Sequence, residues 1–158
     1  AAQYQGMIAE VGATYVPPVP IPLTERQAAV WEAIKSERDR RASLGVKVGS
    51  HWFHSDQKSR TQQVGLALLG ARIPAGLQWK TLTLTPPPVF VAMKPALAQA
   101  IVAATAASDT AIFTAAEAHR VAMEASAAPQ DYDFSVGWPT SIEDEAHEAG
   151  IQFDARVL

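Results

Sequence analysis

The stretch from Ile34 to Gln63 constrains the fold more than any other part of the chain, because it predicts three elements in direct succession. The charged residues 35–41 end a helix, with Gly45 near its C-terminus. Alternating residues on either side of Gly49 and Ser50 predict a short hairpin. Ser55 or Asp56 then caps a second helix that runs to about Leu69.

The first helix is predicted to run from about Glu25 to Ser43. Thr24 is a suitable N-cap, Gln27 completes a capping-box pattern, and Leu23 can act as a hydrophobic staple. Its apolar stripe consists of Val30, Trp31 and Ile34, and it stops there. Beyond Ile34 the helix is charged on every side. Either this end is solvated and held by its own opposite charges, or the charges meet copies of themselves in an oligomer.

A second ribbon follows the second helix. Residues 77–84 and 89–93 read as strands joined by the rigid prolines 86–88, at a sheet edge or standing alone.

The first hairpin should bury Val46, Val48, Trp52 and Phe53. We expect Trp52 and Trp79 to share one core.

From Pro95 to Ala127 the chain is rich in alanine and predicts one long helix with proline in its first turn. Its larger apolar residues are Leu97, Ile101, Ile112, Phe113, Val121 and Met123. This helix should pack along helix 25–43, helix 56–69 or a second copy of itself. The prediction is an α+β fold, mainly helical, with an extended arm at 1–23, a helical and β-ribbon domain at 24–128 and an irregular tail at 129–158.

The arm is predicted to bind a partner. Four prolines between positions 17 and 22 exclude a helix and favour an extended polyproline conformation. An apolar extended segment cannot bury itself, so it must lie on its own domain or on a neighbour. The predicted partner-binding residues are Tyr4, Met7, Ile8, Val11, Tyr15, Val16, Pro17, Pro18, Pro20 and Pro22.

The tail should contain one short helix that is capped by Ser141 and runs to about Ala149, with Gly150 after it. Its acidic residues are Glu143, Asp144, Glu145 and Glu148. We interpret them as a solvated face rather than as an acid–base pair.

Composition excludes several classes of function. A net charge of −3 argues against general nucleic-acid binding, and the lack of cysteine excludes disulfides and thiolate chemistry. No apolar run approaches the ~20 residues of a membrane helix, and no signal peptide is recognisable, so we expect no membrane insertion. The chain begins with Ala1, as a processed product or a piece of a longer polypeptide would.

No constellation of residues predicts catalysis. His51, His54 and Asp56 could ligate a metal, but their spacing in a strand directs them to opposite faces. Ser55 and Ser59 are better explained as residues at a helix start than as nucleophiles. His119 is expected to be a core or interface residue. We therefore predict no enzyme activity, no cofactor and no metal.

The order of motifs resembles an uncharacterised domain family found mostly in tail-fibre and tail-fibre-associated proteins of tailed bacteriophages and prophages. The resemblance spans residues 34 to about 138. It rests on the segments 37–41, 52–56, 59–63, 73–80, 108–113 and 118–119, which include Trp52, Arg60, Trp79 and His119.

This resemblance implies a virion structural protein of the tail, part of a tail fibre or of its attachment to the tail tip or baseplate. It would be synthesised in the cytoplasm of the host bacterium and bind other tail or fibre proteins. We also expect a homo-oligomer, with a trimer favoured. The alternatives are a tail-fibre assembly chaperone and a soluble adaptor that binds a peptide.

Overall fold

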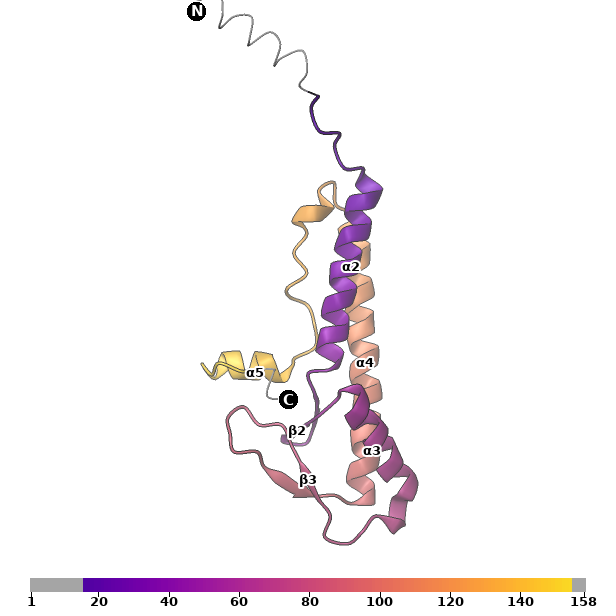
Figure 1. The fold of residues 1–158 in the computed structure, drawn as a ribbon, viewed down its shortest axis with the longest axis vertical. Coiled ribbons are helices and arrows are strands. Elements are labelled where there is room, and N and C mark those ends of the chain that lie inside the picture. Colours follow the sequence, from indigo (N-terminus) through magenta and orange to yellow (C-terminus); the bar gives the residue numbers. More distant parts are fainter. Residues whose placement is uncertain (1–15, 155–158) are drawn as a thin grey trace, which may run out of the picture.

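Two long antiparallel helices form the axis of the molecule (Figure 1). They are α2 (Leu23–Ala42) and α4 (Pro95–Glu124), and they pack along one another. The computed structural model describes residues 16–154. A third helix, α3 (Gln57–Leu69), packs on α4, and two small antiparallel ribbons lie near the same end. The predicted fold class, α+β and mainly helical, is confirmed.

The start of α2 differs from the prediction. The helix begins at Leu23 with Pro22 as its N-cap, and no side chain caps it, so the capping box based on Thr24 and Gln27 is wrong. The carbonyl of Pro22 accepts the backbone N–H of Arg26 instead. Proline has its φ fixed near the helical value, so the extended arm passes directly into the helix.

The hairpin and the cap of α3 agree with the prediction. Strands β1 (Val46–Val48) and β2 (His51–Phe53) pair antiparallel, with Val46 opposite Phe53. Asp56 is the N-cap of α3 and accepts the backbone N–H of Ser59. The sequence therefore specified this local order of elements through turn and cap residues.

The apolar positions of α3 in the sequence are Val64, Leu66, Leu68 and Leu69, and of these only Leu66 packs against the core. Val64, Leu68 and Leu69 are exposed, and the fully buried position is Gln63. The Gln63 side chain donates to the carbonyl of His54 at 2.8 Å. This bond ties α3 to the end of the preceding hairpin and satisfies a buried polar group.

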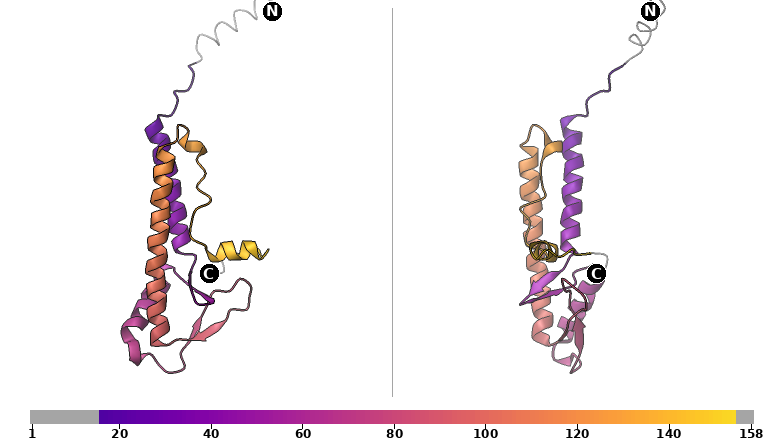
Figure 2. Two further views of the ribbon diagram at one scale, coloured as in Figure 1. Left: turned by 180° about the vertical axis from the view of Figure 1, so that it is seen from behind. Right: turned by 90° about the vertical axis from the view of Figure 1, so that its left-hand side faces the viewer.

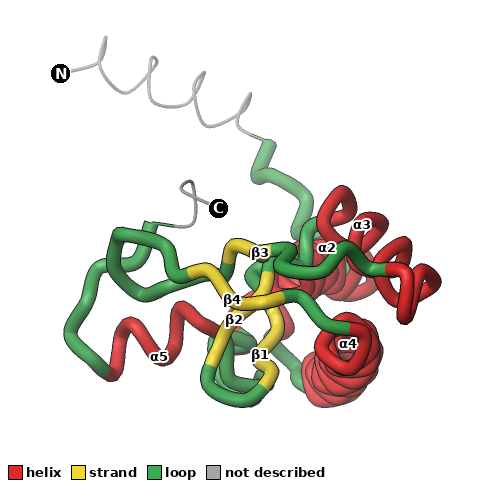
Figure 3. Tube along the Cα trace, turned by 90° about the horizontal axis from the view of Figure 1, so that it is seen from below, coloured by secondary structure: helices red, strands yellow, loops and turns green. Residues whose placement is uncertain are grey.

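The second ribbon consists of β3 (Gln78–Lys80) and β4 (Phe90–Ala92). Beyond β3, Leu82 forms a bridge with Trp52, and its backbone N–H donates to the Trp52 carbonyl at 2.8 Å. The two ribbons are thus joined edge to edge. Figure 3 shows them between α5 (Ile142–Glu148) on one side and the helices α3 and α4 on the other.

The core consists of three clusters, and the two tryptophans do not share one. Trp52 packs with Leu44, Leu82 and Ile142, whereas Trp79 packs at the margin of the cluster around Phe53. Trp52 and Phe53 are adjacent in β2, so their side chains point to opposite faces of the hairpin. The prediction of a single core was wrong because adjacent residues of a strand lie on opposite faces, so Trp52 and Phe53 enter different clusters.

Helix α4 runs without a break through Asp109 and buries Ile101, Ile112 and Met123, while Phe113 and Val121 are exposed. Among the described residues it is the one helix long and apolar enough to cross a membrane by length and composition. The sequence-based statement about apolar runs was therefore too strict. Core helices of folded domains pass the same test, and α4 packs along α2 and α3.

After α4 the chain turns through a short 3-10 helix, η2 (Pro129–Asp131), and returns along the helix pair before entering α5 (Figure 2). Tyr132, Phe134 and Trp138 pack against the third cluster, around Ile34 and Met123. Helix α5 then lies across the axis of the molecule, near the two ribbons.

Candidate interaction site

Residues 16–22 of the arm leave the N-terminal end of α2 without cover from the rest of residues 16–154 (Figure 1). Val16, Val19 and Ile21 expose 81%, 86% and 62% of their surface. Pro17, Pro18, Pro20 and Pro22 are exposed as well. The other predicted partner-binding residues, Tyr4, Met7, Ile8, Val11 and Tyr15, lie outside the described residues. Exposed apolar side chains on an extended segment are available to a partner.

A groove of about 420 Å³ begins where the arm meets α2. One wall comes from α2 and the other from the returning segment, with Tyr132 and Phe134 as its aromatic residues, and Ile21 at the base of the arm lines its mouth. Ala29 and Ala33 are exposed in it, one helical turn apart. Arg26 closes one end through bonds to the Ile21 carbonyl and to the Gln130 side chain.

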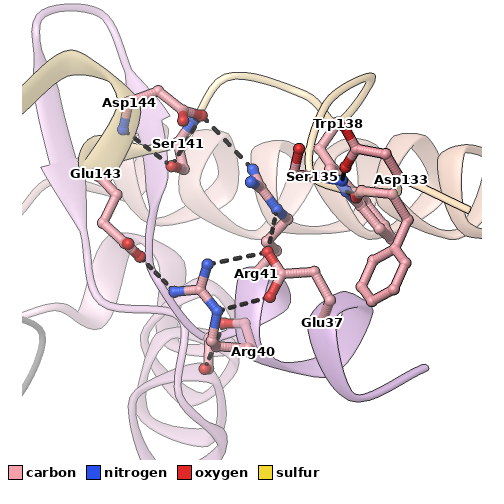
Figure 4. A network of polar contacts seen from close by, with 11 residues as sticks. Glu37, Arg40, Arg41, Asp133, Ser135, Trp138, Ser141, Glu143 and Asp144 are labelled. Atoms are coloured by element: carbon pink, nitrogen blue, oxygen red, sulfur yellow. Dashed lines mark hydrogen bonds and ion pairs between the residues drawn. The ribbon is translucent and has the colours of Figure 1, made fainter. Parts of the chain in front are cut away.

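The charged end of α2 binds α5 (Figure 4). Arg40 donates to both oxygens of Glu37 and also to Glu143, while Arg41 donates to Glu37 and lies 3.5 Å from Asp144. The alternative of a helix end held by its own opposite charges is only part of the arrangement within one chain. Opposite charges within the helix do pair, but the remaining charge is used by the acidic helix of the same chain.

A second set of contacts holds the other side of α5. Glu145 accepts bonds from the Lys47 amine and from the Trp52 indole N–H. Ile142 is fully buried against the cluster that contains Trp52 and Leu82. The acidic residues were predicted to form a solvated face, and this is wrong for the three at the start of the helix. Each of them meets a cation, because the long side chains of α2 and β1 reach this end of the molecule.

The predicted cap of α5, Ser141, is confirmed, and it is part of a full capping box. Ser141 accepts the backbone N–H of Asp144, and the Asp144 carboxylate accepts the N–H of Ser141, which completes a capping box. The guanidinium of Arg41 also lies over the Trp138 ring, 5.5 Å from its centre. Arg41 thus contacts both the returning segment and α5.

Three of these carboxylates have pKa values below their ordinary range. The bond from Arg40 lowers the pKa of Glu37, and bonds from Lys47 and Trp52 lower that of Glu145. Burial raises the pKa of Asp144, but bonds from Ser141 and the charge of Arg41 outweigh it and the pKa is lowered. Their ionised forms are therefore favoured in the folded state.

We expect acid to weaken the docking of α5. A carboxyl group with a lowered folded pKa stabilises the protein above its unfolded pKa, and this stabilisation is lost as the pH falls through the folded value. For Glu145 the loss should begin below its ordinary value of 4.5. Urea unfolding between neutral pH and pH about 3.5 should show a smaller loss in Glu145→Gln than in wild type, by about 0.5–1 kcal/mol. Equal losses in the two proteins would contradict a role for this carboxylate.

His119 is buried and anchors the returning segment to α4. Its Nδ1 lies 2.8 Å from the Tyr132 hydroxyl, and its ring packs against Trp138 with the centres 4.9 Å apart. Among the described residues its Nε2 has no hydrogen-bond partner, and a Cβ at Gly137 would lie 3.5 Å from that nitrogen. The expectation of a core histidine is confirmed, with one ring nitrogen paired and the other not.

The residues considered for catalysis have structural roles. Ser55 is buried, accepts the Gly45 N–H and donates to the Ala42 carbonyl, so it joins the end of α2 to the start of α3. Arg60 donates to both oxygens of Asp109 on α4. Burial lowers the pKa of His54, which favours its neutral form. Within residues 16–154, no group of three His, Asp or Glu residues could hold a metal ion.

The fold is a mainly helical α+β domain with an uncovered arm and a docked C-terminal helix. A family model described as a domain of unknown function, DUF4376, matches residues 25–136, and the chain belongs to that family. No curated protein and no solved structure matches the chain. The matched region ends before Ser141, so α5 lies beyond it.

Sequence reasoning missed the groove and the docking of α5. The groove forms only when residues 130–134 return beside α2, and no short sequence pattern predicts that return. The docking had a signal, since a basic run at 38–41 and an acidic run at 143–148 are complementary in charge. Pairing the two runs would have predicted the contact.

Proposed function

We propose that the chain is a structural protein of a tailed bacteriophage, located in the tail as part of a fibre or of the fibre's attachment to the tail tip. The proposal combines the resemblance seen in the sequence with one structural observation. That observation is the described part of the arm, residues 16–22, an apolar proline-rich segment that the other described residues leave uncovered. In a permanent assembly such a segment would be buried against a neighbour.

The described part of the chain also favours a binding role over an enzymatic one. Its candidate nucleophiles and acids are used in caps and ion pairs. Its helix pair, ribbons and α5 are joined by cation–carboxylate contacts and buried aromatic residues, which suit a scaffold. We therefore propose no reaction, cofactor or metal for this protein.

Mass spectrometry of purified phage particles tests the location. A tail component should be present in a fixed number of copies per particle. A chain that is missing from particles, or present at well below one copy, would contradict the proposal and favour an assembly chaperone. Antibody labelling of intact particles should place the chain at the tail rather than at the capsid.

Deleting residues 1–20 should leave the fold intact and abolish incorporation into particles. The deletion retains Ile21 and Pro22, whose carbonyls bind Arg26, so the start of α2 keeps its hydrogen bonds. Circular dichroism and melting temperature should match those of the full chain. Normal incorporation of the shortened chain would contradict the docking role of the arm. A chain with Val19→Ser alone is a milder version, since Val19 is exposed and makes no contact that the fold needs.

A further inference from the structure

We infer that the arm of one copy binds the groove between α2 and residues 130–134 of a second copy of this chain. The inference deepens the proposed docking role of the arm by naming its partner. It assigns the groove as the receptor for residues 16–22.

The chemistry of the groove fits an extended proline-rich segment. Pro22 has φ −57° and ψ 150°, which are polyproline II angles, and the described arm has no charged residue. Segments of this conformation bind in shallow apolar grooves lined by aromatic rings. Tyr132 and Phe134 supply the rings here, and the small side chains of Ala29 and Ala33 leave the floor open.

The rim offers a donor as well. Polyproline segments have free backbone carbonyls, because they make no internal hydrogen bonds. The oxygen of the Gln130 side chain accepts a bond from Arg26, which leaves its amide nitrogen as a donor at the edge of the groove. Apolar contact with the rings and one such bond would together fix the direction of the bound arm.

The geometry of Arg26 favours a second copy over the chain's own arm. Its Nε donates to the Ile21 carbonyl and its backbone N–H donates to the Pro22 carbonyl. These bonds set the direction in which residues 16–22 leave α2, and these residues project away from the helix pair (Figures 1 and 2). Ile21 lines the mouth of its own groove, but for residues 16–19 to follow it into the groove the chain would have to reverse at Pro20, where φ is fixed.

The length of the described arm is sufficient for two copies of the chain to exchange arms. Residues 16–22 in polyproline II span about 20 Å at ~3.1 Å per residue. The groove begins beside the base of the arm, so two copies placed end to end can exchange arms reciprocally. Each arm then covers the groove of its partner, and both exposed apolar surfaces are removed from water together.

Disulfide trapping tests the contact directly, because the chain has no cysteine. Full-length Val19→Cys is mixed with affinity-tagged Ala33→Cys under mild oxidation, and the tagged–untagged dimer is measured. The matched control is Ala28→Cys, since Ala28 and Ala33 are both exposed on α2 but only Ala33 lines the groove. We expect at least a several-fold higher yield with Ala33→Cys. Equal yields would overturn the inference. When Val19→Cys and Ala33→Cys are combined in one chain, a disulfide that forms within that chain would also overturn the inference.

A second measurement uses the oligomeric state. The full chain should self-associate in light scattering, and Ala33→Glu should weaken this association by about ten-fold or more, because it would bury an unpaired charge. Ala28→Glu should not, and both variants should keep the helical content of wild type. A wild-type chain that stays monomeric at high concentration would overturn arm exchange. It would leave the proposed tail location standing, because particle composition tests that location separately.

Discussion

Replacing Phe53 with alanine should destabilise the protein by about 3–5 kcal/mol, the usual range for a fully buried aromatic residue. Phe53 is 1% exposed and sits at the centre of the first cluster, opposite Val46 and against Met93 and Ile101. These neighbours come from β1, from the loop after β4 and from α4, so no single shift can close the cavity. Urea unfolding of the full chain at neutral pH measures the loss.

Phe90→Ala is the matched control for that experiment. Phe90 lies on β4 in the second ribbon and is 55% exposed, so its loss should cost less than about 1 kcal/mol. If the two substitutions had equal effects, the inward face of β2 would be assigned wrongly. A one-residue change of register would exchange the positions of Phe53 and Trp52.

The parts of the fold that sequence reasoning predicted correctly are those set by local chemistry. Asp56 and Ser141 mark helix starts because their side chains accept orphan N–H groups, and both caps are present. Pro95 opens the long helix at its first turn. In each case the residue acts within one turn of its own position, so the sequence alone carries the information.

The errors occur where the decision depends on a distant segment. Val64, Leu68 and Leu69 of α3 have the right chemistry for a core, but α3 meets its neighbours through Leu66 and Gln63, so these three face outward. The acidic start of α5 looked like a solvated face. It is docked because Arg40, Arg41 and Lys47 lie far away in sequence and close in space.

The candidate interaction site also has one part that local sequence predicts and one part that depends on a distant segment. The arm was predicted from its prolines, and its described residues are exposed as an interaction segment should be. The receptor for it was not predicted, because one wall comes from α2 and the other from a segment about one hundred residues later. Only the folded arrangement brings Ala33 and Phe134 to one groove.

Replacing Gly45 with alanine should have the second large effect, a loss of at least about 2 kcal/mol from backbone strain and crowding together. Gly45 has φ +127°, which alanine rarely adopts, and its N–H is bound to the Ser55 hydroxyl. A Cβ there would lie 2.8 Å from Leu82 Cδ1 and 3.1 Å from the Phe53 carbonyl oxygen. The leucine can move aside, but the carbonyl is part of the hairpin backbone.

Gly49→Ala is a comparison at a glycine that is not crowded. Gly49 also has a positive φ, +62°, but no atom lies within 4 Å of the position its Cβ would take. This variant therefore reports the cost of a left-handed alanine without crowding, about 1–2 kcal/mol. Thermal unfolding should rank wild type above Gly49→Ala and Gly49→Ala above Gly45→Ala. If Gly45→Ala were as stable as Gly49→Ala, the close approach of Leu82 and Phe53 to the end of α2 would be wrong. The edge-to-edge joining of the two ribbons, which depends on that approach, would then need revision.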